Sequence, residues 1–302
     1  MKLATLRLGT RTTAARIEEA DGEAVEVSAA DVGSLLAQPN WPQIAAMAAG
    51  TRHLLDEADY APLVPHPGKV VCIGQNYRAH ILEQGAKPPE YPTLFAKFSS
   101  ALIGARDDIV LPESSQAVDW EVELAAVIGW PARNVGEAEA LEAVAGYAVL
   151  NDVSMRDWQY RTSQFLQGKT FDRCTPFGPW LVTRDDPGVD EQGMDLSCEI
   201  DGETVQHGNT GDLVFGVAKL VSYISQAMTL APGDVISTGT PGGSGHWREP
   251  RRYLGDGNVM VSRAQGLGEC TNAVRTGAPA PSEPGHRARP GPEHERGPYA
   301  DA

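Results

Sequence analysis

The most informative segment of the chain is DWEVELAAVI, which occupies residues 119–128. Side chains two residues apart on a β-strand share a face, so Glu121 and Glu123 are expected to point the same way. Two adjacent carboxylates repel each other unless both face water or a cation lies between them. The apolar run Leu124–Ile128 indicates a buried strand rather than an exposed edge. A cation is therefore favoured over a solvated strand face, which remains the alternative.

A third carboxylate, Asp152, follows another strand-like run, YAVLN at residues 147–151. Strand ends that open into loops often carry functional groups. Three carboxylates completed by water suit a hard cation such as Mg²⁺ or Mn²⁺, with Ca²⁺ a further option, better than Zn²⁺. The spacing alone does not place Asp152 beside the glutamate pair, so this metal site is a prediction for the structure to test.

Residues 66–274 have the pattern of a β-rich domain. Short runs rich in β-forming residues end near Gly, Asn or Pro, namely 69–73, 124–128, 147–150 and 234–237. An Asp201-Gly202 turn predicts a hairpin between residues 196–200 and 203–205. Helical periodicity is present over 138–145 and 213–228, but regular βαβ alternation is not. The predicted fold class is therefore α+β and β-dominated.

Two segments flank this domain. Residues 1–65 are predicted to form a small N-terminal α/β domain, with a strand at 3–8, a partner at 12–17 and short helices within 34–49. The punctuation VPHPG at 64–68 marks the boundary. Residues 275–302 are expected to be a disordered tail, because Gly277–Ala302 holds six Pro and four Gly and few large apolar side chains.

Composition narrows the function. The chain has 302 residues and a net charge of −15, from 25 Lys+Arg against 40 Asp+Glu, which argues against nucleic-acid and anionic-membrane partners. It has no apolar run near the ~20 residues that span a bilayer, and the N-terminus does not resemble a signal peptide. The four cysteines are scattered without metal-ligand spacing. We therefore expect a reduced cytoplasmic protein with core thiols and a small-molecule substrate.

The best candidate for a general base is His80. It precedes Glu83 by three residues, which brings the two side chains together on a helical turn. A carboxylate beside histidine fixes the tautomer and raises the basicity of the ring. An ordinary surface pair is the alternative.

Several later residues could bind an anionic substrate. Arg156, Gln159 and Lys169 offer hydrogen-bond donors. The Gly-rich segment STGTPGGSG at 237–245 is not a P-loop, since no Lys follows. It offers backbone N–H groups and hydroxyls that could hold a carboxylate, with a plain turn as the alternative.

Taken in order, these segments resemble the fumarylacetoacetate hydrolase family. The resemblance covers about residues 66–274 and rests on five separated motifs: GQNYRAH at 74–80, EVE at 121–123, NDVSMRDWQ at 151–159, GKTFD at 168–172 and STGTPGG at 237–243. It implies a mixed β-sheet roll preceded by a small domain, a homodimer and one divalent metal per subunit.

The resemblance also implies roles for particular residues. Glu121, Glu123 and Asp152 match the metal ligands, and His80 with Glu83 matches a water-activating dyad. Lys169 matches a group that stabilises developing negative charge. Positions implied to contact substrate are Tyr77, Lys97, Arg156, Gln159, Gly239 and Thr240. His246-Trp247, beyond the Gly-rich segment, is expected to reshape the pocket.

From these roles the leading hypothesis is hydrolytic C–C cleavage of a 2,4-dioxo acid, of the acylpyruvate or fumarylpyruvate type, giving pyruvate and a carboxylic acid. The family also suggests an oxaloacetate-type decarboxylase, or a tautomerase or isomerase of 2-hydroxy-dienedioates. Sugar-acid dehydration and a non-catalytic metal-binding scaffold complete the alternatives, because a shared fold does not choose among activities.

Overall fold

The computed structural model describes residues 1–277, and a long mixed sheet forms its centre. Strand β10 (Val122–Ile128) pairs antiparallel with β11 (Val144–Asn151) on one side and β16 (Val235–Ser237) on the other. Every residue of β10 and β11 is buried. The segment that we read as a buried strand is therefore the middle of the sheet, and the predicted β-dominated α+β class is confirmed.

Eleven strands belong to this sheet. Its order is β4 (Arg52–Leu54), β3 (Glu23–Glu26), β2 (Arg11–Glu18), β1 (Lys2–Leu8), β13 (Thr175–Thr183), β11, β10, β16, β5 (Val70–Gly74) and β6 (Thr93–Lys97), with β7 (Leu102–Ile103) beside β13. Because β16 and β5 run parallel, the chain from residue 237 and the chain from residue 74 leave the sheet at the same end.

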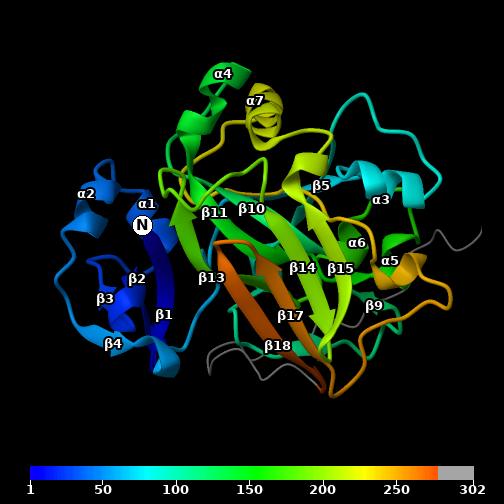
Figure 1. Cartoon of the computed structure of the whole chain (residues 1–302), viewed down its shortest axis with the longest axis horizontal. Coiled ribbons are helices and arrows are strands. Elements are labelled where there is room, and N and C mark those ends of the chain that lie inside the picture. The colour runs from blue at the N-terminus through cyan, green and yellow to red at the C-terminus, as the bar shows by residue number, and fades with distance from the viewer. Residues whose placement is uncertain (278–302) are drawn as a thin grey trace, which may run out of the picture.

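A second, five-stranded sheet lies against the first (Figure 1). Its order is β15 (Glu203–Asn209), β14 (Asp195–Ile200), β17 (Val259–Ala264), β18 (Gly268–Thr276) and β8 (Ile109–Leu111). The predicted hairpin is β14–β15, and its turn residues Asp201 and Gly202 have φ of 54° and 81°, as a two-residue hairpin turn requires. Buried side chains of both sheets, such as Leu124 and Cys198, share one core.

The chain also forms short α-helices. They are α1 (Val32–Leu36), α2 (Trp41–Ala46), α3 (Arg78–Glu83), α4 (Glu137–Ala140), α5 (Arg156–Gln159), α6 (Leu166–Lys169) and α7 (Val217–Ala227). Helix α7 lies within the predicted 213–228. The prediction for 138–145 is wrong after Ala143, because Val144 already pairs with Ile128 in the sheet. A small pair, β9 (Val118–Asp119) with β12 (Ser154–Met155), lies beside the central strands.

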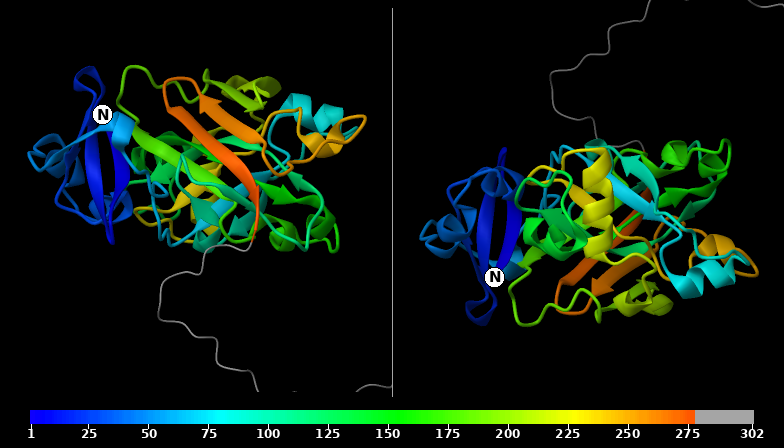
Figure 2. Two further views of the ribbon diagram at one scale, coloured as in Figure 1. Left: turned by 90° about the horizontal axis from the view of Figure 1, so that it is seen from below. Right: turned by 90° about the horizontal axis from the view of Figure 1, so that it is seen from above.

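The N-terminal segment forms one end of the molecule in both figures (Figures 1 and 2). It is continuous with the main sheet, because Lys2 and Leu3 of β1 pair with Val182 and Leu181 of β13. Leu3 also packs in one core with Val127. The division at residue 65 therefore separates two parts of one sheet, and independent folding of residues 1–65 stays a prediction.

Three further predictions meet the structure here. Strand β18 continues to Thr276, so the first two residues of the predicted tail are strand, and residues 278–302 lie outside the described part of the chain. All four cysteines are buried and free, as expected for core thiols. Among residues 1–277, no helix has the length and apolar character that crossing a bilayer requires.

Candidate active site

Three buried carboxylates meet where β10 begins and β11 ends. Glu121 directly precedes β10, Glu123 lies on it, and Asp152 follows β11. The backbone N–H of Asp152 donates to the Glu121 carbonyl (2.8 Å), which ties the two strand ends together. One oxygen from each of the three side chains lies within 4.8 Å of the others. The long-range pairing that sequence spacing left open is therefore made by the β10–β11 register.

Two buried lysines contact this cluster. The Lys169 ammonium bridges Glu121 (2.6 Å) and Asp152 (2.8 Å). Lys97 approaches Asp152 on its other oxygen (2.7 Å) and also donates to the Val153 carbonyl (3.1 Å). Asp152 thus has two cationic partners and is held on both sides.

Glu123 differs from its neighbours because no lysine or arginine pairs with it among residues 1–277. Its carboxylate accepts hydrogen bonds from the Ser237 hydroxyl (2.5 Å) and the Gly239 N–H (2.9 Å). Burial, and then repulsion from Asp152 and Glu121, raise the pKa of Glu123 well above its usual range. A divalent cation would compensate this charge, and three oxygen ligands suit a hard ion. The site therefore fits a metal of the kind that the sequence predicts.

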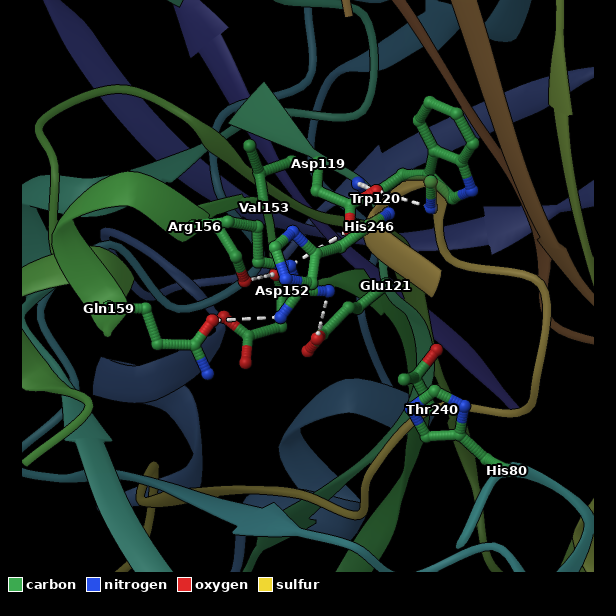
Figure 3. A network of polar contacts seen from close by, with 12 residues as sticks. His80, Asp119, Trp120, Glu121, Asp152, Val153, Arg156, Gln159, Thr240 and His246 are labelled. Atoms are coloured by element: carbon green, nitrogen blue, oxygen red, sulfur yellow. Dashed lines mark hydrogen bonds and ion pairs between the residues drawn. The ribbon is translucent and has the colours of Figure 1, made fainter. Parts of the chain in front are cut away.

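Arg156 links the carboxylates to the substrate side of the site. Its guanidinium contacts Asp119 (2.8 Å) and Glu121 (2.6 Å) and donates to the Gln159 side-chain carbonyl (2.8 Å). Although burial acts in the opposite direction, Arg156 and Lys169 lower the pKa of Glu121 to about 2. Figure 3 shows this network, with the Glu121 carboxylate drawn between Arg156 and His80. The side-chain oxygen of Gln159 accepts from Arg156, and its NH₂ group donates to no residue among 1–277, so it can donate to a ligand.

A cavity of about 300 Å³ lies over these groups. Its polar wall includes seven predicted site residues, which are His80, Glu121, Glu123, Arg156, Gln159, Lys169 and Thr240. Aromatic side chains form much of the rest, namely Phe95, Tyr160, Phe165 and Trp247. A cavity lined by two cations, two carboxylates and several aromatic side chains suits a small anionic ligand that reaches a bound metal.

The predicted dyad is formed at the edge of this cavity. His80 is buried on α3, and its Nδ1 lies 2.9 Å from a Glu83 carboxylate oxygen. The hydrogen bond from His80 lowers the pKa of Glu83. Glu83 also accepts from the Gly243 N–H (3.4 Å), so the dyad contacts the Gly-rich segment after β16.

Three of the predicted substrate-contact residues do not line the cavity, and the hydroxyl of a fourth, Thr240, is bonded to the protein backbone. Lys97 donates to Asp152, and the Gly239 N–H donates to Glu123. Tyr77 is fully buried, and its hydroxyl has no partner among the described residues. Thr240 lines the cavity, but its hydroxyl donates to the Val122 carbonyl (2.9 Å). Substrate contact by these four residues stays a prediction.

Other residues at the site had no role assigned from the sequence. The Asp119 carboxylate accepts hydrogen bonds from the Arg156 guanidinium and from the backbone N–H groups of Gly245 and His246. The Ser237 hydroxyl donates to Glu123. Asp119 and Ser237 both lie inside sequence segments quoted above, but only the tertiary structure shows which residues they contact. Gln84 lines the cavity and touches His80; its place four residues after His80 was the available signal.

Comparison with known proteins identifies the family of this chain. The family model for the fumarylacetoacetate (FAA) hydrolase C-terminal domain matches residues 69–275. The chain therefore belongs to the fumarylacetoacetate hydrolase family, whose members include enzymes that act as tautomerases and isomerases.

Two relatives represent the sequence matches. The mitochondrial oxaloacetate tautomerase FAHD2A of Homo sapiens is 44% identical over 220 residues, which cover 72% of this chain and 70% of that protein. A putative hydrolase of Burkholderia multivorans is 44% identical over 265 residues, 86% of this chain and 94% of its own.

Solved structures extend the likeness to the N-terminal segment. A putative HpcE protein from Mycobacterium smegmatis has a TM-score of 0.83 at 36% identity and covers 92% of this chain and 100% of its own. The 2-hydroxyhepta-2,4-diene-1,7-dioate isomerase from Mycobacterium marinum has a TM-score of 0.75 at 31% identity, covering 91% of this chain and 98% of its own.

Proposed function

We propose that this protein is a divalent-metal-dependent tautomerase of a small enolisable 2-oxo acid of the oxaloacetate type. The observation that carries the proposal is that one cavity is lined by His80, whose Nδ1 contacts Glu83, and also by Glu121, Glu123, Arg156 and Lys169. Such a site has a base, an anion-binding side and a place for a metal. The 44% identity to a named oxaloacetate tautomerase supports the same choice.

Each residue has a distinct task in this reaction. His80, oriented by Glu83, takes a proton from the carbon next to the 2-oxo group, and the released electron pair forms the carbon–carbon double bond of the enol. The negative charge that moves to the 2-oxo oxygen is stabilised by the Lys169 ammonium, which has one N–H not used by Glu121 or Asp152. That oxygen then takes a proton from solvent to give the enol, protonated His80 releases its proton to solvent, and the reverse sequence gives the keto form.

Glu121, Glu123 and Asp152 would hold the metal, for which we propose Mg²⁺ or Mn²⁺, with Ca²⁺ a weaker fit to catalysis. When bound, this ion would act as a Lewis acid toward the substrate carboxylate and 2-oxo oxygen. Gln159, whose NH₂ group has no acceptor among residues 1–277, donates to the substrate carboxylate and orients it from the Arg156 side.

Hydrolytic cleavage of an acylpyruvate is a second candidate, favoured by the space in the cavity for a longer acid and a water. His80 would then take its proton from water, whose oxygen attacks the C4 carbonyl. The C3–C4 bond breaks, its electron pair stays on the pyruvate fragment, and protonation of C3 completes pyruvate. Both reactions need the same base and the same stabilised negative charge, so the architecture serves either one.

Ultraviolet absorbance of the enol distinguishes the candidates. Oxaloacetate, acetylpyruvate and fumarylpyruvate are each incubated with the enzyme and Mg²⁺ or with EDTA, and free pyruvate and CO₂ are assayed in parallel. We expect faster keto–enol equilibration of oxaloacetate without CO₂ release, lost with EDTA and reduced at least hundredfold in His80→Ala. Stoichiometric pyruvate from acetylpyruvate or fumarylpyruvate would identify the hydrolase instead, and CO₂ from oxaloacetate a decarboxylase. Full activity of His80→Ala would remove the dyad from the mechanism.

A further inference from the structure

In the substrate-free structure, the proposed base His80 has a hydrogen-bond partner, Gln84, that the proposed reaction does not require. Both ring nitrogens of His80 are occupied: Nδ1 faces Glu83 at 2.9 Å, and Nε2 lies 2.6 Å from the side-chain amide nitrogen of Gln84. Gln84 directly follows α3, four residues after His80, so the two side chains lie on one face of the same helical turn. His80 and Gln84 both line the cavity.

The partners of the ring determine which nitrogen carries the proton. An ionised carboxylate only accepts hydrogen bonds, so Nδ1 is the protonated nitrogen of the neutral ring. Nε2 then carries a lone pair, and an amide NH₂ group is a suitable donor to it. The amide of Gln75 donates to the Gln84 side-chain oxygen (3.4 Å), which turns the Gln84 nitrogen toward His80. The arrangement of Glu83, His80, Gln84 and Gln75 is therefore consistent in every donor and acceptor.

We propose that Gln84 is a positioning residue that covers the Nε2 lone pair of His80 in the resting enzyme and holds the ring as its Nδ1–H tautomer. Substrate must displace the amide before His80 can take a proton. Once displaced, the amide faces the cavity and can donate to the far end of the substrate. This inference rests on the role of His80 in the proposed function, but it concerns a state of the free enzyme and can be tested without turnover.

The surroundings of the pair support displacement. His80 is buried, whereas Gln84 is only partly buried and Gln75 is exposed. The contact between the two glutamines is long at 3.4 Å, so it orients the amide at little energetic cost to its release. By contrast, Glu83 is an ionised carboxylate that makes a charge-assisted hydrogen bond with His80 at 2.9 Å, whereas Gln84 is a neutral amide. The Gln84 amide can therefore move away from Nε2 of His80 while Glu83 stays hydrogen-bonded to Nδ1.

The first test is spectroscopic and uses the substrate-free wild-type protein loaded with Mg²⁺. Long-range ¹H–¹⁵N correlation spectra distinguish the two neutral tautomers of histidine. We expect the His80 signals to report Nδ1–H with an unprotonated Nε2. An Nε2–H tautomer would overturn the proposal, because Nε2 would then have no lone pair to cover.

The second test measures access to Nε2 with diethyl pyrocarbonate, which acylates an unprotonated imidazole nitrogen. The rate at His80 is followed by mass spectrometry of the peptide that contains it. We expect Gln84→Ala to raise this rate at least fivefold. Gln84→Glu has the same size but can only accept, so it favours a doubly protonated ring that stays as slow as the wild type. Leu82→Ala, an exposed change in the same helix, should leave the rate unchanged.

The variants also give separate kinetic outcomes. We expect Gln84→Glu to lower kcat at least tenfold with a smaller change in KM, because a protonated His80 cannot accept the substrate proton. If Gln84 only filled space, Gln84→Glu would keep the wild-type kcat, and Gln84→Ala would be acylated at the wild-type rate. Either of these two results would overturn the proposal. Failure of these tests leaves the His80→Ala result, and with it the proposed function, unaffected.

Discussion

Replacing Lys97 with methionine tests whether this lysine holds a metal ligand in place or contacts substrate. Its ammonium is fully buried and makes a 2.7 Å ion pair with the fully buried Asp152. Methionine keeps most of the volume of the side chain and removes the charge. Among residues 1–277, Asp152 would then retain Lys169 as its one cationic partner.

The size of the effect follows from burial. Removing one partner of a buried ion pair costs about 3–5 kcal/mol, and the remaining contact with Lys169 places Lys97→Met near 3 kcal/mol. At roughly 2–4 °C per kcal/mol for a domain of this size, the melting temperature of the metal-free protein should fall by about 6–12 °C. Mn²⁺ should restore more stability to the variant than to the wild type, because Asp152 then regains a second cation.

Urea unfolding and thermal melting, each with and without Mn²⁺, measure these values. Lys69→Met is the matched variant, since Lys69 also makes a 2.7 Å pair, with Asp234, but is partly exposed at 31%. Water can replace its ammonium, so we expect a loss of about 1 kcal/mol or less. A Lys97→Met protein that unfolds within 1 kcal/mol of the wild type but has a tenfold higher KM would refute the positioning role and support substrate contact.

Three further predictions concern Glu123. Ser237→Ala removes a 2.5 Å hydrogen bond to the Glu123 carboxylate and should weaken Mn²⁺ binding about 10–100-fold, as measured by isothermal titration calorimetry. The control Thr238→Val loses a hydrogen bond to the Leu124 carbonyl and should bind Mn²⁺ as the wild type does. Gly239→Ala places a Cβ 3.0 Å from the Ile73 carbonyl oxygen at φ +97°, so it should unfold at lower urea than Gly257→Ala, which has φ +86° and nothing within 4 Å; equal midpoints would contradict this. Burial, and then repulsion from Asp152 and Glu121, raise the pKa of Glu123 in the folded state. The metal-free protein should therefore lose stability as the pH rises from the ordinary glutamate pKa through the raised value. Mn²⁺ affinity should increase over the same pH range, and an affinity that does not change with pH would show that Glu123 is already ionised.

Much of the fold follows from local sequence patterns. The apolar run after Glu123 gave the central strand, and Asp201-Gly202 gave the hairpin with both turn residues at positive φ. The prediction of helix over 138–145 was wrong at its end because a sheet partner outweighs local helical periodicity. Pairing of β1 with β13 joins residues 1–65 to the main sheet, and contacts between residues about 180 apart have no local signature.

The residue types of the site could be named from the sequence, since carboxylates, a histidine–glutamate pair and a Gly-rich segment imply their chemistry wherever they lie. Which of them touch is a property of the tertiary structure. The β10–β11 register brings Asp152 to the glutamates, and the parallel pairing of β16 with β5 places Ser237 and Gly239 near the segment that leads to His80. The packing also decides the electrostatics: among residues 1–277 Glu123 has no lysine or arginine partner, Asp152 has two lysines, and Gln84 contacts His80. In a site with little water, each charge and lone pair depends on these nearest partners.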